Sequence, residues 1–244
     1  MAEWNEQHRS QQQGFTGASV PRAGEVFDEG LRKHMLSIYN YMTSGILLTG
    51  VVAMLTARSG LAVTFASGPM MWLVALSPLA IVFAMSFGQN KFSRGTLQMM
   101  FWGFAILMGL SLSTIFLVYT GASIAATFFA TAGAFAGLSL YGYTTKKDLS
   151  GWGSFLIMGV IGLIIASVIN MFLGSSTMEL VISFLGVLIF AGLTAYDTQR
   201  LKTEYSMYRG TEYAGKAIIL GALSLYLDFI NMFLFLLRFM GSRE

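Results

Sequence analysis

Long stretches without a charged side chain are the feature that most restricts how this chain can fold. Asp, Glu, Lys and Arg are absent from residues 36–57, 59–90, 95–145, 149–178 and 180–196. A helix needs about 20 predominantly apolar residues to cross a bilayer, so residues 95–145 alone are long enough for two. Only 11% of the 244 residues are charged, against about 25% in a typical soluble domain. The chain is therefore predicted to be an all-α, polytopic membrane protein.

Local helix breakers divide the uncharged stretches into seven predicted spans. Pro69 opens the second helix, because proline lacks an N–H group that the first helical turn does not use. Residues 119–121 divide the longest stretch, and residues 174–177 separate the fifth helix from the sixth. The predicted helices lie near residues 36–57, 70–89, 97–118, 122–143, 152–173, 178–206 and 213–238.

The polar ends of the chain form separate segments in this reading. Residues 1–34 carry both signs of charge and a glutamine run, and we expect a disordered cytoplasmic tail there. Residues 35–240 form the seven-helix transmembrane domain, and residues 241–244 form a short C-terminal tail. No apolar segment opens the chain, so no cleavable signal peptide is expected.

The distribution of basic residues predicts the orientation in the membrane. With the N-terminus inside, 12 of the 15 basic residues lie on the inner side, and Arg58, Arg238 and Arg243 lie on the outer side. The positive-inside rule then places the N-terminus in the cytoplasm of a multi-pass inner (plasma) membrane protein. An odd number of spans places the C-terminus outside, whereas a re-entrant sixth segment would return it to the cytoplasm.

Several residue types exclude whole classes of function. The chain has no cysteine, which excludes disulfides and thiolate metal sites. His8 and His34 precede the first span, which excludes a buried histidine cluster. The basic residues are scattered among short loops and fit topology signals better than nucleic-acid binding. We expect no required cofactor and no nucleic-acid partner. Gly133 and Gly137, in GxxxG spacing, predict close helix packing, as do Gly159 and Gly162.

Two aspartates, Asp197 and Asp228, interrupt the uncharged C-terminal spans. Residues 201–208 contain no helix breaker, so the sixth helix is expected to continue to a turn at residues 209–214. Asp197 then lies 12 residues before the turn and Asp228 lies 14 residues after it. At ~1.5 Å per residue these distances are ~18 and ~21 Å. The two carboxylates, here called the aspartate pair, are predicted to meet at one depth between antiparallel helices.

A carboxylate pair inside a helix bundle predicts an ion-binding or pH-sensing site. One ionised carboxylate costs at least ~2.5 kcal/mol on insertion scales, and a pair reduces that cost by sharing a proton. Asn231 follows Asp228 by one turn and is expected to support the pair, as is Tyr196 beside Asp197. Carboxylate oxygens suit Ca²⁺, which makes Asp197 and Asp228 possible ligands of a bound or transported Ca²⁺ ion. A purely structural hydrogen-bonded link between the two helices is the alternative.

Three segments of the membrane region carry a family pattern. They are Gly109–Phe116 (GLSLSTIF), Tyr141–Leu149 (YGYTTKKDL) and Gly192–Gln199 (GLTAYDTQ). The most specific mark is Tyr-Asp-Thr-Gln in the sixth helix, followed by an aspartate in the seventh. Over roughly residues 30–240 the chain resembles the Bax inhibitor-1 family, also called the transmembrane Bax inhibitor motif proteins, in a bacterial form.

The resemblance implies two three-helix layers around a central C-terminal helix. It also implies a passive, pH-sensitive Ca²⁺ leak channel governed by an aspartate pair, which maps here onto Asp197 and Asp228. In the family's mechanism, an arginine of the second helix latches onto the pair. This sequence has no Lys or Arg between Arg58 and Lys91. The latch is therefore missing, replaced by a neutral donor, or supplied from elsewhere.

Three other functions are weighed against ion transport. Relatives described as partners of a membrane-anchored AAA protease suggest a non-transporting regulator that binds other membrane proteins, with residues 1–34 as the handle. An intramembrane aspartyl protease would need Gly-x-Gly-Asp at its second aspartate, whereas residues 225–228 read LYLD and no Pro-x-Leu follows. We therefore expect no enzyme. A retinal-type receptor is disfavoured because no lysine lies in the middle of the seventh helix.

Overall fold

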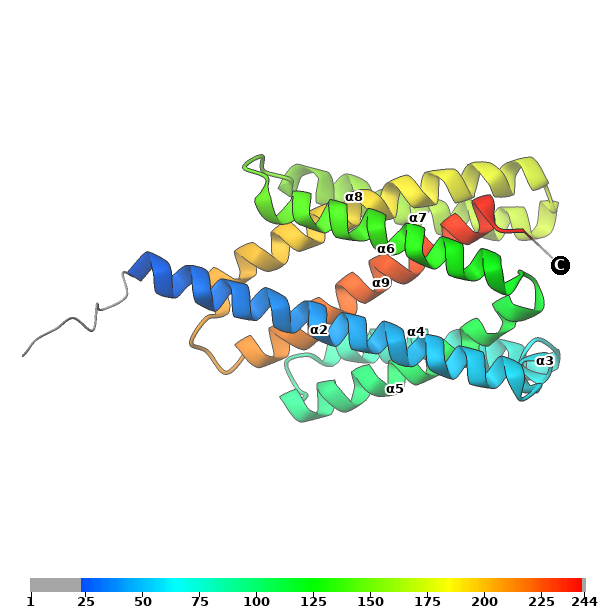
Figure 1. Ribbon diagram of the computed structural model, residues 1–244, viewed down its shortest axis with the longest axis horizontal. Helices are drawn as coiled ribbons and strands as arrows, with labels where there is room; N and C mark the ends of the chain where they lie inside the picture. Colours follow the sequence, from blue (N-terminus) through cyan, green and yellow to red (C-terminus); the bar gives the residue numbers. More distant parts are fainter. Residues whose placement is uncertain (1–22, 243–244) are drawn as a thin grey trace, which may run out of the picture. The chain divides into compact units, whose positions relative to one another are not determined.

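The structure, a computed structural model, describes residues 23–242. The chain divides after Lys33 into two units, and each is described by itself. Within the described residues, seven helices are long and apolar enough to cross a membrane (Figure 1). The elements are α2 (Ala23–Arg58), α3 (Leu61–Phe65), α4 (Gly68–Gly88), α5 (Arg94–Leu112), the 3₁₀ helix η1 (Ser113–Leu117), α6 (Gly121–Thr144), α7 (Ser150–Leu173), α8 (Ser176–Tyr208) and α9 (Ala214–Met240).

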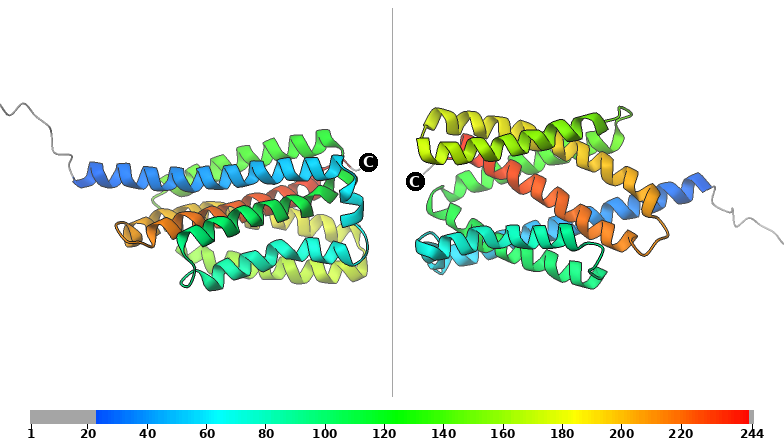
Figure 2. Two further views of the ribbon diagram at one scale, coloured as in Figure 1. Left: turned by 90° about the horizontal axis from the view of Figure 1, so that it is seen from below. Right: turned by 180° about the vertical axis from the view of Figure 1, so that it is seen from behind.

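The C-terminal helix α9 is the central element among the described helices. In its most apolar stretch 61% of the residues are buried, whereas only 11% are buried in α4 and in α7. Helix α9 contacts α5, α6 and α8. It crosses between a group formed by α2, α4 and α5 and a group formed by α6, α7 and α8 (Figures 1 and 2). The predicted two three-helix layers around a central C-terminal helix are confirmed.

The outward face of α7 is a continuous apolar surface. Ile161, Ile164 and Val168 are 53%, 58% and 49% exposed. Soluble monomers rarely expose contiguous apolar patches larger than a few hundred Å². An outer helix with such a face is expected where the helix contacts the hydrocarbon of a bilayer. The burial pattern therefore agrees with a bundle whose α7 faces lipid.

Tyr226 fastens α9 to the layer that contains α2 and α5. Its side chain is fully buried. The tyrosine hydroxyl donates to Thr49 Oγ1 of α2 at 2.7 Å, and the Thr49 hydroxyl donates to the carbonyl oxygen of Ala105 in α5 at 2.8 Å. The Phe104 ring meets the Tyr226 ring edge-on, with centroids 4.9 Å apart. One side chain thus joins three helices, and both its hydroxyl and that of Thr49 are paired.

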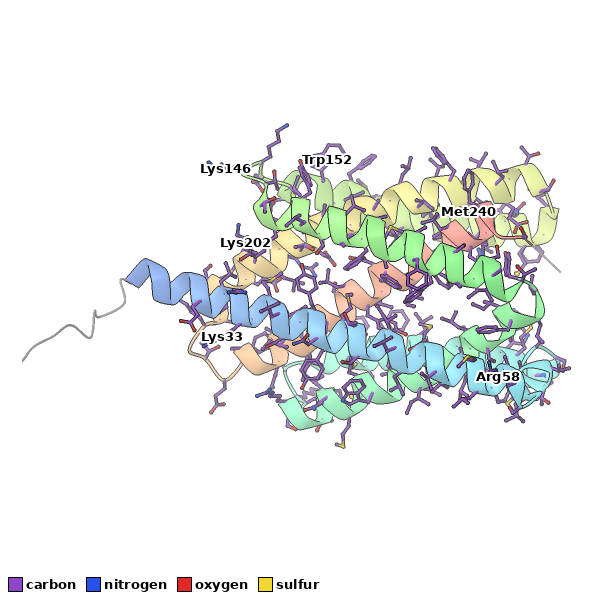
Figure 3. The ribbon with its side chains drawn as sticks, in the orientation of Figure 1. Lys33, Arg58, Lys146, Trp152, Lys202 and Met240 are labelled. Atoms are coloured by element: carbon purple, nitrogen blue, oxygen red, sulfur yellow. The ribbon has the colours of Figure 1, made fainter. Side chains whose placement is uncertain are left out.

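The two ends of the bundle differ in charge. Lys146 and Lys202 lie at one end, here called the basic end, and Arg58 and Met240 lie at the other (Figure 3). Helix α8 is one unbroken helix of 33 residues, so the alternative of a re-entrant sixth segment is wrong. The C-terminal end of α9 therefore lies opposite the basic end. There the backbone N–H of Thr120 donates to the carbonyl oxygen of Ser242 at 3.2 Å. Which end faces the cytoplasm stays a prediction.

The turn between α8 and α9 confirms the predicted extension of the sixth helix. Helix α8 ends at Tyr208, and Gly210 adopts a left-handed backbone conformation with φ of 77°. Glycine populates this region readily because it has no Cβ. Helix α9 then begins at Ala214. Both aspartates therefore lie well inside long antiparallel helices, and neither is at a helix end.

The first helix begins earlier than the sequence predicted. Helix α2 starts at Ala23, so residues 23–34, which the polar composition placed in the tail, are helical. Lys33 Nζ lies 2.8 Å from Glu29 Oε1, a pair four residues apart that stabilises an exposed helix. Polar composition alone therefore did not prevent a helix here. The rest of the predicted tail, residues 1–22, lies outside the described residues.

The predicted third helix changes its geometry near its end. It is α-helical to Leu112 and continues as η1. The hydroxyl of Ser113 donates to the carbonyl oxygen of Leu110 at 2.6 Å, and that of Thr114 donates to the carbonyl oxygen of Ser111 at 3.0 Å. Such local side-chain bonds compete with the α-helical ladder, and short 3₁₀ segments are common at helix ends.

Most of the glycines predicted to mediate close packing do not do so within this chain. A Cβ atom at Gly133 or Gly137 would meet open space, whereas one at Gly142 would collide with the backbone carbonyl of Ala195 in α8. Of the second predicted pair, only Gly159 faces a neighbouring helix. GxxxG spacing marks a helix face but does not say where that face points. The close approach of α6 to α8 occurs at Gly142.

Candidate functional site

The segment Tyr196–Gln199 of α8 sends consecutive side chains to different neighbours. The tyrosine ring packs against Gly153 of α7. The threonine oxygen accepts a hydrogen bond of 2.9 Å from Ser139 of α6, because its own proton goes to a carbonyl in α8. The glutamine bonds the α6–α7 loop at the carbonyl of Lys147 and the N–H of Leu149, both at 2.8 Å. These contacts fix the rotation of α8 and leave the aspartate facing α9.

Asp197 is held by a closed ring of polar contacts. Its side chain is 7% exposed, and its Oδ1 atom lies 3.1 Å from Arg200 Nη1. The hydroxyl of Ser224 in α9 donates to Asp197 Oδ2 at 2.6 Å. Arg200 Nη2 in turn donates to the Ser224 oxygen at 3.0 Å. One buried carboxylate therefore has both of its oxygens occupied, one within α8 and one across the interface.

Asp228 lies at the same helix interface, but its carboxylate has fewer polar partners than that of Asp197. It is 5% exposed, and its Oδ2 atom has no hydrogen-bond partner among the described residues. Asp197 and Arg200 are the charged groups that act on it electrostatically. Ser224 precedes Asp228 by one helical turn, which places both on one face of α9. Buried polar atoms are nearly always paired, so this free oxygen can accept a proton or a cation.

The two residues expected to support the aspartate pair have other contacts. The amide of Asn231 donates to the carbonyl oxygen of Leu227 in its own helix at 2.8 Å. Tyr196 packs on α7, and its ring centroid lies 5.8 Å from the guanidinium carbon of Arg200. Tyr196 can therefore act on the site through Arg200, by a cation–π contact.

A polar cavity of about 720 Å³ lies between α4, α8 and α9 near the basic end. Neither aspartate lines this cavity, but Arg200 and Ser224, which contact Asp197, both do. Tyr213 donates to Gln89 Oε1 at 2.7 Å on its wall. Burial raises the pKa of Tyr213, so its hydroxyl stays a donor at neutral pH. The polar residues of the wall are Ser86, Gln89, Asn90, Arg200, Glu204, Tyr208, Tyr213 and Ser224.

A second cavity of about 580 Å³ continues toward the opposite end and is lined mainly by apolar side chains of α4, α5, α7, α8 and α9. We call it the apolar cavity. Val82 of α4 and Leu227 of α9 line both cavities. These two side chains therefore mark the boundary between the polar cavity, which can hold water, and the apolar cavity, which disfavours water.

The aspartate pair is not a ready-made metal centre. Within the part of the chain that the structure describes, no three His, Cys, Asp or Glu side chains are grouped to hold a metal ion. Ca²⁺ takes about 6–8 oxygen ligands in stable protein sites. An ion held by two carboxylates would therefore keep much of its water and leave readily.

Comparison with known proteins gives the family. Residues 31–244 match the family described as "Inhibitor of apoptosis-promoting Bax1". The chain belongs to the Bax inhibitor-1 family. The match covers all three motif segments and both aspartates, so the resemblance inferred from the motifs is confirmed. This member is a multi-pass inner-membrane protein.

Bacterial relatives are similar over almost their whole length. The inner membrane protein YbhL of Escherichia coli (strain K12) is 47% identical over 230 residues, which cover 92% of this chain and 98% of YbhL. An uncharacterized protein of Caulobacter vibrioides is 48% identical over 241 residues, covering 93% and 96% of the two chains. One of Borreliella burgdorferi is 43% identical over 215 residues, covering 87% and 93%.

Three residues around the pair were not singled out from the sequence. From the sequence, Arg200 counts only as one of the basic residues that predict the topology, and neither Glu204 nor Ser224 stands out. Their spacing carried a usable signal, because residues three or four apart share a helix face. Arg200 follows Asp197 by three positions, and Ser224 precedes Asp228 by four. In this family member the partner of Asp197 is thus supplied by α8 itself, with Ser224 of α9 as a neutral donor.

Proposed function

We propose that this protein mediates a passive, pH-sensitive leak of Ca²⁺ across the inner membrane through the interface of α8 and α9, and that it is not an enzyme. Asp197 and Asp228 are the ion-binding and pH-sensing residues. The observation that carries the proposal is the pair itself: two buried carboxylates of α8 and α9 that interact electrostatically, one of them with an oxygen that has no hydrogen-bond partner among the described residues. Carboxylates inside a membrane are costly and usually mark an ion or proton path.

The polar cavity supports the proposal because its wall includes two residues that contact Asp197. An ion that enters from the basic end reaches Arg200 and Ser224, which are one contact away from Asp197. Beyond Val82 and Leu227 the path becomes apolar. The described arrangement is therefore closed, and conduction requires α4 and α9 to separate at this boundary.

Titration of the pair supplies the pH sensitivity. Two neighbouring carboxylates bind a divalent cation best when both are ionised, and repel each other when no cation is present. Protonating one of the two carboxylates has two effects at once. It removes their mutual repulsion, and it weakens the binding of the cation. The number of bound protons therefore changes both the packing of α8 against α9 and the occupancy of the site.

Partner binding is a separate property of the same chain in this account. The lipid bilayer is the partner that the fold requires, and a membrane-anchored AAA protease is the protein partner that the family resemblance suggested. The segment expected to bind such a protein partner, residues 1–34, lies largely outside the described residues. Deleting residues 1–22 tests it without touching any residue of the ion site.

The Asp197→Asn variant is expected to lower the Ca²⁺ flux at neutral pH by about tenfold or more, equivalent to a barrier raised by about 1.4 kcal/mol. Asparagine keeps the size of the side chain but removes the charge that the cation needs. The flux is measured in proteoliposomes that contain a Ca²⁺-sensitive dye, with protein-free vesicles as the baseline.

Lys202→Gln is the matched control for this experiment. Lys202 lies on α8 close to the site, but its Nζ atom bonds the carbonyl oxygen of Tyr143 at 2.8 Å, away from both aspartates. Its flux should equal that of the wild type. Equal thermal unfolding of wild type and Asp197→Asn shows that the variant is folded. A folded Asp197→Asn variant with wild-type flux would contradict the proposed role.

A further inference from the structure

Three carboxylates and one guanidinium interact around the polar cavity. Asp197, Asp228 and Glu204 each feel the charge of Arg200, and Glu204 and Asp228 also feel the charge of Asp197. With all four groups ionised, one positive charge faces three negative charges. The cluster therefore attracts further cations even though Arg200 is present.

Arg200 lies between two of these carboxylates and is bound unequally to them. Its Nη1 atom is 3.1 Å from Asp197 Oδ1, and its Nη2 atom bonds Ser224. On the other side Nε is 3.4 Å from Glu204 Oε1, and that atom makes no hydrogen bond within the described residues. The guanidinium is thus ion-paired with Asp197 and hydrogen-bonded to Ser224, and it is more loosely paired with Glu204.

The exposure of these side chains shows which of them a solute meets first. The side chain of Arg200 is 36% exposed and that of Glu204 is 31% exposed, whereas that of Asp197 is 7% exposed. Both of the more exposed residues line the polar cavity, and Asp197 does not. A cation in the cavity therefore meets Arg200 and Ser224 before it reaches Asp197, and the guanidinium occupies the Oδ1 side of that carboxylate.

We propose that Arg200 is a tethered competitor for the cation at Asp197, and that Glu204 is the second position to which its guanidinium moves when a cation binds. This inference rests on the proposed function, because it concerns the regulation of the same site. It assigns one role to each residue. Arg200 lowers the affinity of the aspartate pair for the cation, and Glu204 raises that affinity by holding the displaced guanidinium.

The chemistry of arginine makes displacement necessary. A guanidinium stays protonated in proteins, so Arg200 cannot make room for a cation by losing its charge and must move. Glu204 is four residues after Arg200 on α8, a spacing at which side chains of opposite charge meet. Arg200 Nε already lies 3.4 Å from Glu204 Oε1, so the second carboxylate is within reach of the same side chain. The fixed fork of donors can then pair with that carboxylate.

Ca²⁺ binding to the purified full-length protein in nanodiscs, followed by isothermal titration calorimetry, tests this directly. Arg200→Gln should tighten Ca²⁺ binding by about tenfold, a typical coupling between two ligands of one protein. Glu204→Gln should weaken binding by about fivefold, at the lower end of the same range. Lys202→Gln and Glu212→Gln remove one charge each from outside the cluster and should leave the affinity unchanged.

The double variant Arg200→Gln/Glu204→Gln separates the proposed role of Glu204 from direct ligation. If Glu204 acts only by holding the guanidinium, its replacement has no further effect once Arg200 is gone. A fivefold loss that persists in the double variant would show that Glu204 binds Ca²⁺ itself and would overturn the inference. Wild-type or weaker affinity in Arg200→Gln would overturn it as well. Unchanged Ca²⁺ affinity in Asp197→Asn would instead refute the proposed function, so the two failures are distinguishable.

Discussion

A serine in place of Leu227 is expected to raise the Ca²⁺ leak by about tenfold, equivalent to a barrier lowered by about 1.4 kcal/mol. Leu227 and Val82 are the side chains at which the polar cavity meets the apolar one. Hydrophobic constrictions in channels close by excluding water, and a hydroxyl group lets water remain. Dye-loaded proteoliposomes measure the initial rate of Ca²⁺ influx at neutral pH.

Position 227 has a matched control on the same helix. Leu220 lies two turns earlier in α9 and lines the polar cavity only, so Leu220→Ser makes the same chemical change without touching the boundary. Its leak should stay at the wild-type rate, whereas Val82→Ser should raise the leak from the opposite wall. Equal rates for Leu227→Ser and Leu220→Ser would show that the ion does not cross this boundary.

Leucine in place of Gly142 is expected to lower the free energy of unfolding by about 3 kcal/mol, at the upper end of the usual penalty for overpacking. A Cβ atom at this position of α6 collides with the carbonyl of Ala195, two residues before Asp197. Backbone cannot move aside as a flexible side chain can, so α6 and α8 must separate. Thermal unfolding of the detergent-solubilised protein measures the loss.

The same exchange at Gly133 provides the comparison. Gly133 lies on α6 as well, but a Cβ atom there meets nothing within 4 Å. Gly133→Leu should change the stability by no more than about 0.5 kcal/mol, as surface substitutions usually do. Equal destabilisation by the two variants would contradict the assignment of Gly142 as the contact between α6 and α8.

The architecture was largely predictable because the bilayer imposes it. Uncharged stretches of sufficient length can be read as spans, and helix breakers such as Pro69 fall where the chain turns. The end of α8 was predictable for the same reason, since no breaker precedes Arg209 and glycine follows it. The depth of Asp197 and Asp228 then followed from the constant rise of a helix.

The rotation of each helix was not predictable from one sequence. Gly133 and Gly142 look alike in the sequence, yet one faces outward and the other touches α8. Facing depends on contacts with distant segments, such as those of Tyr196 with Gly153. Asn231 shows the same limit, because its amide satisfies a carbonyl in its own helix.

The charge environment of the aspartate pair was the other missing part. Arg200 was counted among the basic residues that set topology, although its spacing from Asp197 also permits an ion pair. Only the structure shows that its side chain turns back toward the aspartate and reaches Ser224. The start of α2 at Ala23 was missed for a related reason, since exposed i,i+4 ion pairs stabilise a helix without an apolar signature.

The central claim is that the aspartate pair governs a pH-sensitive Ca²⁺ leak, and Ca²⁺ flux against pH for wild type and Asp228→Asn tests it most directly. Wild-type flux should change with pH, because protonation of the pair alters both the repulsion between the carboxylates and the cation site. Asp228→Asn leaves one carboxylate of the pair, Asp197, which Arg200 and Ser224 already hold, so its flux should be low and nearly independent of pH. A folded Asp228→Asn variant with the wild-type rate and the wild-type pH profile would contradict the account.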